Sequence, residues 1–254
     1  MGQILTKYNQ GSLGWAEFAD AQFDPQNSFS YFVDFIQYDA ANDYFIATNS
    51  VGTGAAAFTQ NSAHGGTLTL STAASSTAND QAIIASPIDL FELTGGRRAY
   101  IEVRFKSASS FVATGNWVLG LTAATPATTV FSGAAVSVPI NSIMVGRDQG
   151  TDSLTGASAT AGRNIQLFTR DGTNSMVETV CPMSETISIT AFQRVGFLCN
   201  GNTVQAFYNG KKVGNPVTLA AATTAAMGIY MAVQTTNTAA VAAEVDYIAA
   251  AFTR

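Results

Sequence analysis

Charged side chains are scarce in this sequence of 254 residues. Lys, Arg, Asp and Glu together make up 11% of the chain, against about 25% in an average soluble protein. The net charge of −5 and the pI near 4.7 leave no basic field that could neutralise nucleic-acid phosphates. Hydrophobic residues nevertheless make up 47%, which excludes the composition of a disordered chain. We therefore expect a folded protein that binds no nucleic acid.

Histidine and cysteine are even rarer. His64 is the only histidine, and Cys181 and Cys199 are the only cysteines. These residues are too few for a zinc site or a disulfide framework, and a lone histidine in a glycine-rich turn is typical of a surface loop. We expect two buried free thiols, no metal and no cofactor.

Long hydrophobic runs are absent as well. The stretch 213–243 has no charge, but Asn215, Pro216, Gln234 and many threonines interrupt it, whereas a membrane-spanning helix needs about 20 consecutive apolar residues. The first residues have neither the basic start nor the apolar core of a signal peptide. We expect no membrane association.

Alternation of polar and hydrophobic residues is the dominant pattern. In 100–106, Glu102, Arg104 and Lys106 alternate with hydrophobic residues, which predicts an antiparallel strand with one buried and one solvated face. No stretch sustains a helical period with caps. Similar runs predict strands at 31–38, 67–71, 81–85, 117–122, 142–146, 164–170, 186–190, 194–199, 203–208, 228–234 and 241–252.

Asx-Gly pairs separate several of these runs, at 171–172, 200–201 and 209–210. Such pairs readily adopt the positive φ angles of tight hairpin turns, so they predict a β-meander. Short strands, glycine-rich turns and no helices together indicate an all-β antiparallel sandwich or barrel.

The first 27 residues lack this alternation. Trp15, Phe18 and Phe23 are scattered among polar residues. Residues 1–27 therefore form either an irregular first segment packed on the sandwich or an arm whose three aromatic side chains bind a partner. We divide the chain into this segment and a β-sandwich over residues 28–254.

Three long stretches contain no charged residue: 44–79, 107–146 and 213–243. A soluble monomer usually keeps charges on its exposed faces and edge strands to prevent association. Their absence predicts a surface that contacts other protein, as in a homo-oligomer. The alternative is a hydroxyl-rich surface that hydrogen-bonds to water.

Residues 193–213, QRVGFLCNGNTVQAFYNGKKV, resemble the central hairpins of the concanavalin A-like, laminin-G-type jelly rolls. Residues 98–105 and 244–248 resemble an early strand and the last strand of that fold. The resemblance implies a concanavalin A-like jelly-roll β-sandwich and carries no information about activity.

The Ala-, Thr-, Ser- and Gly-rich composition also resembles that of virion structural proteins of tailed bacteriophages, several of which carry this jelly roll. This likeness implies a non-enzymatic capsid decoration or cement protein, made in the host cytoplasm and bound to the major capsid protein or other virion proteins on the capsid surface. The alternative is a glycan-binding module of a phage tail or fibre. Sugar sites on this fold use an exposed aromatic residue, but Trp117 alternates in phase with Leu119 and Leu121, so we expect it in the core.

Glycosidases of the same superfamily carry Glu-x-Asp-x-Glu on one strand, where alternate carboxylates share a face. Here Glu244 and Asp246 are followed by Ile248 at the place of the third acid, so we expect no catalytic residues. Asp148 and Asp152 could donate oxygens to calcium, but their spacing does not match a dedicated calcium loop. We interpret this stretch as a polar turn.

Overall fold

The computed structural model contains seventeen β-strands and no α-helix in the part of the chain that it describes. The described residues are 28–35, 47–52, 54–61, 66–72, 79–86, 89, 91–93, 96–107, 115–123, 128–133, 135–148, 164–172, 175–183, 191–219, 225–236 and 239–253. No helix among them is long and apolar enough to cross a membrane.

The strands form two large antiparallel sheets and one small hairpin. The eight-stranded sheet consists of β1 (Ser28–Val33), β3 (Ala57–Asn61), β4 (Thr67–Ser71), β6 (Arg98–Ser107), β13 (Gln193–Asn200), β14 (Thr203–Tyr208), β15 (Lys211–Thr218) and β17 (Ala242–Thr253). The seven-stranded sheet consists of β2 (Ala47–Val51), β5 (Gln81–Ala85), β7 (Gly115–Thr122), β10 (Ser142–Arg147), β11 (Asn164–Arg170), β12 (Val177–Pro182) and β16 (Gly228–Thr235). The hairpin is β8 (Phe131–Ser132) with β9 (Ala135–Val136).

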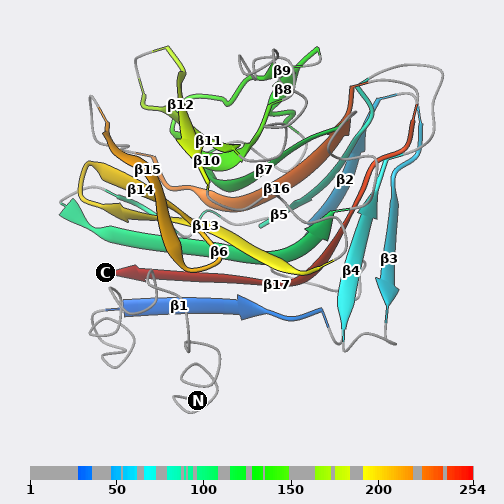
Figure 1. Ribbon diagram of the computed structural model, residues 1–254, viewed down its shortest axis with the longest axis horizontal. Helices are drawn as coiled ribbons and strands as arrows, with labels where there is room; N and C mark the ends of the chain where they lie inside the picture. Colours follow the sequence, from blue (N-terminus) through cyan, green and yellow to red (C-terminus); the bar gives the residue numbers. More distant parts are fainter. Residues whose placement is uncertain are drawn as a thin grey trace.

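The two sheets stack and curve in the same sense (Figure 1). Their orders are β15-β14-β13-β6-β17-β4-β3, with β1 also beside β17, and β12-β11-β10-β7-β16-β5-β2. Central neighbours such as β6 and β17 are far apart in sequence, as a jelly roll requires. The predicted all-β antiparallel jelly-roll sandwich is therefore confirmed.

One continuous hydrophobic core fills the space between the sheets. The inward side chains of alternating positions meet there. Trp117 of β7 is fully buried, and the centroid of its ring lies 4.9 Å from the ring centroid of Phe105 on β6. The expectation that Trp117 belongs to the core is confirmed.

Most predicted strands occur at or near their predicted residues, and the run 186–190 lies outside the described part. The turns after β13 and β14 have positive φ at Gly201, Asn209 and Gly210, and β13, β14 and β15 form the predicted meander. The pair Asp171-Gly172 lies between the paired strands β11 and β12. The predicted runs do not include β2, β3, β8, β9, β12 or β15.

The outward face of β6 is less solvated than its sequence predicts. Glu102 is only 2% exposed, and its carboxylate accepts hydrogen bonds from the hydroxyls of Tyr100 and Tyr247, both at 2.7 Å. Burial and the Glu102 carboxylate together raise the pKa of Tyr247 above its ordinary value. The prediction of a fully wet face was wrong because two tyrosines satisfy this carboxylate in place of water.

The outer face of the seven-stranded sheet is also covered. Val130, Phe131, Val136 and Val138 from the β8–β9 region pack over it and form a second hydrophobic cluster with residues such as Tyr230. Every residue of β5, β7, β10 and β16 is buried. Burial on both faces within this chain therefore accounts for part of the charge-free stretches 107–146 and 213–243.

Candidate functional site

The three aromatic residues that the sequence offers for partner binding, Trp15, Phe18 and Phe23, lie outside the described residues, as do His64 and Asp152. Cys181 and Cys199 are buried free thiols, as expected. Burial raises the pKa of Cys181 to about 11 and that of Cys199 to about 12, so both thiols stay protonated near neutral pH.

Glu244 and Asp246 lie on the outward side of β17, and both take part in ion pairs. Lys106 Nζ lies 2.6 Å from Glu244 Oε2, and the hydroxyl of Thr67 donates to Glu244 Oε1 at 2.9 Å. Asp246 pairs with the guanidinium of Arg104. Ile248 is buried in the inter-sheet core, so no third carboxylate joins this pair from that position.

Asp148 follows β10 and is fully buried. Its Oδ2 accepts a hydrogen bond from the backbone N–H of Val136 at 2.8 Å, and its own N–H donates to Gln166 Oε1 at 2.8 Å. Asp148 thus anchors the β8–β9 hairpin. Among the described residues, no group of three or more His, Cys, Asp or Glu side chains could hold a metal ion.

Three amide side chains form a row on the outer face of the seven-stranded sheet. Gln234 of β16 lies in register with Gln81 of β5 and Asn116 of β7. Asn116 Nδ2 donates to Gln234 Oε1 at 3.0 Å, and Gln234 Nε2 donates to the carbonyl of Gly133 at 2.8 Å. Thr129 donates to Gln81 Oε1 at 2.8 Å. These amides hold the hairpin region in place, so in this conformation the row is buried rather than presented to a ligand.

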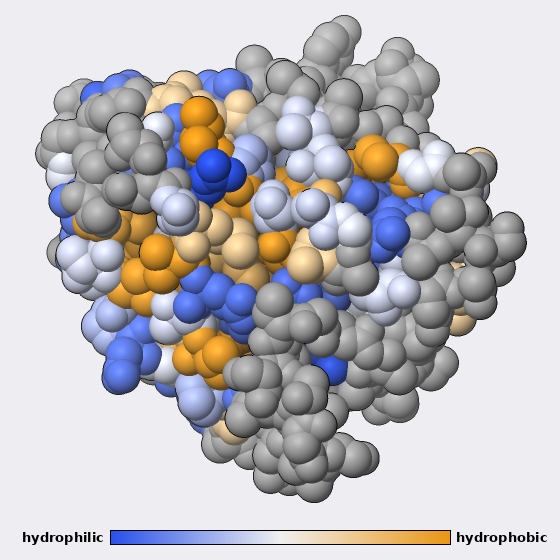
Figure 2. Space-filling view, turned by 90° about the horizontal axis from the view of Figure 1, so that it is seen from above, coloured by the Kyte–Doolittle hydropathy of each residue, from blue (hydrophilic) through white to orange (hydrophobic). Residues whose placement is uncertain are grey.

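The face of the molecule that Figure 2 shows from above has hydrophobic residues interspersed with polar ones. Large exposed hydrophobic residues in the described part are Ile140, Val177 and Val180. Val177 and Val180 belong to β12, the edge strand of the seven-stranded sheet, and Val177 is 51% exposed.

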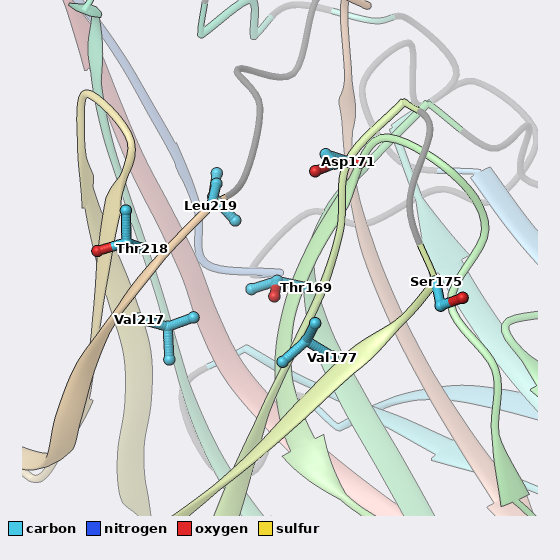
Figure 3. Close-up of a pocket in the computed structure, with 7 residues that line it drawn as sticks. All are labelled: Thr169, Asp171, Ser175, Val177, Val217, Thr218 and Leu219. Atoms are coloured by element: carbon cyan, nitrogen blue, oxygen red, sulfur yellow. The ribbon is translucent and has the colours of Figure 1, made fainter.

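A pocket opens where β12, at the edge of the seven-stranded sheet, meets β15, at the edge of the eight-stranded sheet. Its volume is about 70 Å³, and it is lined from β11 and the following turn, from β12, and from the end of β15 by Thr169, Asp171, Ser175, Val177, Val217, Thr218 and Leu219. In Figure 3 the oxygens of Thr169 and Asp171 lie toward the middle of this group, whereas those of Ser175 and Thr218 are turned toward its rim.

The pocket combines deep polar groups with apolar walls. Thr169 and Asp171 are each only 4% exposed, and Val177 and Val217 face each other across the gap in Figure 3. A carboxylate accepts up to about four hydrogen bonds, and a hydroxyl both donates and accepts. Complete small-molecule pockets have about 300–1,000 Å³, so this one has room for a substituent of a larger ligand.

No pattern in the sequence indicates this pocket. Val177 and Val217 lie in strands that were not predicted, and residues 169–177 and 217–219 meet only because the two sheet edges come together in the fold. The sequence predicts Asp171 only as part of a turn.

No family model matches the sequence, and no curated protein matches it either. Solved structures do match. The carbohydrate recognition domain of Emp47p superposes with a TM-score of 0.57 at 12% identity, over 89% of this chain and 97% of that one. The exoplasmic/lumenal domain of VIP36, in its Ca²⁺/Man-bound form, gives 0.55 at 9% identity, over 87% and 88%.

This chain has a concanavalin A-like jelly-roll fold. A structure described as a native glycosidic hydrolase also matches, with a TM-score of 0.54 at 13% identity, over 87% of this chain and 94% of that one. At such identities the likeness establishes the architecture alone.

Proposed function

We propose that this protein is a non-catalytic carbohydrate-binding β-sandwich and that the pocket between β12 and β15 receives part of the sugar. The observation that carries the proposal is the placement of the buried Asp171 and Thr169 in a pocket whose other walls include Val177, Val217 and Leu219. The carbohydrate recognition domains among the similar folds support the same function.

The pocket chemistry suits a saccharide. Sugars present hydroxyl groups together with apolar C–H patches. Asp171 and Thr169 can bond hydroxyl groups, while Val177 and Val217 can contact C–H groups. Because the pocket is small, the remainder of the sugar would lie over its rim, beside Val177 and the hydroxyls of Ser175 and Thr218.

The ion pairs of Glu244 and Asp246 favour a binding function over hydrolysis. A retaining glycosidase needs one carboxyl group that stays protonated and a second that attacks the sugar. Here Glu244 pairs with Lys106 and Asp246 pairs with Arg104, so each carboxylate has a structural role on the sheet surface.

A glycan array with the purified full chain tests the proposal. We expect retention on a restricted set of glycans, and we expect Asp171→Asn to weaken it at least about tenfold, equivalent to 1.4 kcal/mol. Asp148→Asn is the matched control, because Asp148 is also a buried carboxylate but does not line the pocket. Absence of retention on any glycan, or equal loss in both variants, would contradict the proposal.

The role in a virion remains a prediction from composition. A capsid decoration protein and a tail or fibre lectin both need a stiff β-sandwich, and the carbohydrate recognition domains among the similar folds favour the lectin. Whether the chain forms a homo-oligomer also stays a prediction. Locating the chain in an assembled particle would test the virion role separately from sugar binding.

A further inference from the structure

The side chains that line the pocket between β12 and β15 offer oxygen atoms but no nitrogen atoms. Asp171 contributes a carboxylate, three residues contribute hydroxyl groups, and the remaining three are aliphatic. The hydroxyl groups belong to Thr169, Ser175 and Thr218. None of the lining residues is a lysine, an arginine or a histidine. The lining side chains therefore bring one negative charge to the pocket and no positive charge.

The pairing of β11 with β12 accounts for this distribution of charge. Thr169 lies opposite Val177 in the register of the two strands, and directly opposed side chains share one face of a sheet. Because successive side chains alternate between the faces, Asp171 lies on the side of Thr169, whereas Arg170 lies on the other side. Arg170 Nη1 accordingly donates to the carbonyl of Val138 at 3.2 Å, in the cluster over the outer face. The cation next to Asp171 in the sequence thus faces away from the pocket.

Burial makes the carboxylate of Asp171 selective for positively charged donors. Removing a charge from water costs free energy, and folding has already removed most water from Asp171, which is only 4% exposed. A hydrogen bond that involves charged groups is about twice as strong as one between neutral groups, and charge attraction is stronger in a buried site than in water. An ammonium group on the ligand therefore gains more from this carboxylate than a hydroxyl group does, and an anionic group meets a like charge.

We infer that the pocket selects an amino sugar, that is, a saccharide with a free and protonated amine; this inference rests on the proposed sugar-binding function. The ammonium group donates to the carboxylate of Asp171 and to the hydroxyl of Thr169. The carbon that carries the amine contacts Val177 and Val217. The volume of about 70 Å³ admits such a substituent, while the sugar ring stays at the rim. Sugars that bear carboxylate, sulfate or phosphate groups are excluded.

Sugars that differ in one substituent test this selectivity in the full chain. The probes are glucose, glucosamine and N-acetylglucosamine, together with the corresponding galactose and mannose series, at a mildly acidic pH that keeps the amines protonated. Acetylation removes the positive charge of an amine, so the acetylated sugars control for the nitrogen atom itself. NMR chemical shifts of an isotope-labelled sample follow each titration. In at least one series we expect the amino sugar to bind about tenfold more tightly than both of its counterparts, with shifts at the amides of Asp171 and Val177.

Three variants assign the preference to the carboxylate. Asp171→Asn should bring the ratio of the two affinities, amino sugar over neutral sugar, close to one. Thr218→Lys should do the same, because it adds an ammonium group to the rim that repels the ligand's own; Thr218 is exposed, so this variant keeps the test decisive if Asp171→Asn fails to fold. Thr59→Lys is the matched control. Thr59 is exposed on β3, at the opposite edge of the sheet from β15, and this variant should keep the wild-type ratio.

Equal affinities for the amino sugar and its neutral counterpart in every series overturn the amino-sugar inference and leave the sugar-binding function in place. A preference that persists in Asp171→Asn, or in Thr218→Lys, overturns it too. Amides of the pocket that no amino sugar shifts overturn it whatever the glycan array shows. Only an array without retention contradicts the sugar-binding function itself, so the two failures are distinguishable.

Discussion

Gly214 of β15 lies directly against Cys181 of β12. A Cβ atom on Gly214 would stand 2.7 Å from Cys181 Sγ and 2.9 Å from its Cα, and the backbone of Gly214 has φ +65°. This close approach joins the edges of the two sheets along β12 and β15, the two strands that also contribute residues to the pocket. The seam between these two strands therefore has no room for a side chain at position 214.

Gly214→Ala should destabilise the fold by about 2 kcal/mol or more, since it combines a positive φ with a clash against backbone. Gly133→Ala is the matched control: Gly133 has φ +60°, but nothing lies within 4 Å of its Cβ position. Urea unfolding of both variants measures the difference. Equal destabilisation would mean that the edge contact is not tight.

Stability should fall as the pH rises above 9. The pKa of Cys181 is raised from 9.0 to about 11 and that of Cys199 to about 12 by burial. The unfolded chain therefore releases these protons first, so the stabilisation is complete below pH 9 and is lost as the pH approaches the folded values. Cys199→Ala should flatten the curve of unfolding free energy between pH 9 and 11. A curve parallel to that of the wild type would refute this assignment.

Asp148→Ala should loosen the β8–β9 hairpin. The hydrogen bond from the Val136 N–H to the carboxylate is worth about 1.5–3 kcal/mol, so hydrogen exchange at Val136 should accelerate about ten- to a hundredfold. Amides of β14 should keep their protection. Asp89→Ala, at an exposed site, serves as the control, and an unchanged Val136 rate would exclude the anchoring role.

Glu244→Gln should cost about 1–2 kcal/mol in unfolding free energy, because it weakens a partly buried ion pair with Lys106 and the bond from Thr67. Glycan retention should not change. A turnover assay on any polysaccharide that the chain binds should detect no hydrolysis. Activity that Glu244→Gln abolishes would instead identify a catalytic carboxylate.

The sequence predicts strands best where a strand is central. The alternation or continuous hydrophobicity at 81–85 and 228–234 reflects burial, and β5 and β16 are indeed buried throughout. Edge strands escaped prediction because most of their residues are exposed: β3 and β15 show only isolated buried or half-buried positions. Without a buried face there is no period-2 signal for a strand.

The candidate pocket could not be predicted for the same reason. It is built from the edge strands β12 and β15 and from the turn at Asp171, and nothing in the local sequence indicates that these segments meet. The burial of Glu102 is likewise not visible in the local sequence, because Tyr247, one of its two tyrosine partners, comes from a strand that lies far away in the sequence.

Calorimetric titration of the best array glycan into Val177→Phe and Val180→Phe tests the central claim most directly. Both valines are exposed on β12, at 51% and 37%, but only Val177 lines the pocket. A phenylalanine at 177 should fill the pocket and abolish binding, while Val180→Phe should bind like the wild type. Wild-type affinity in Val177→Phe would contradict sugar recognition at this pocket.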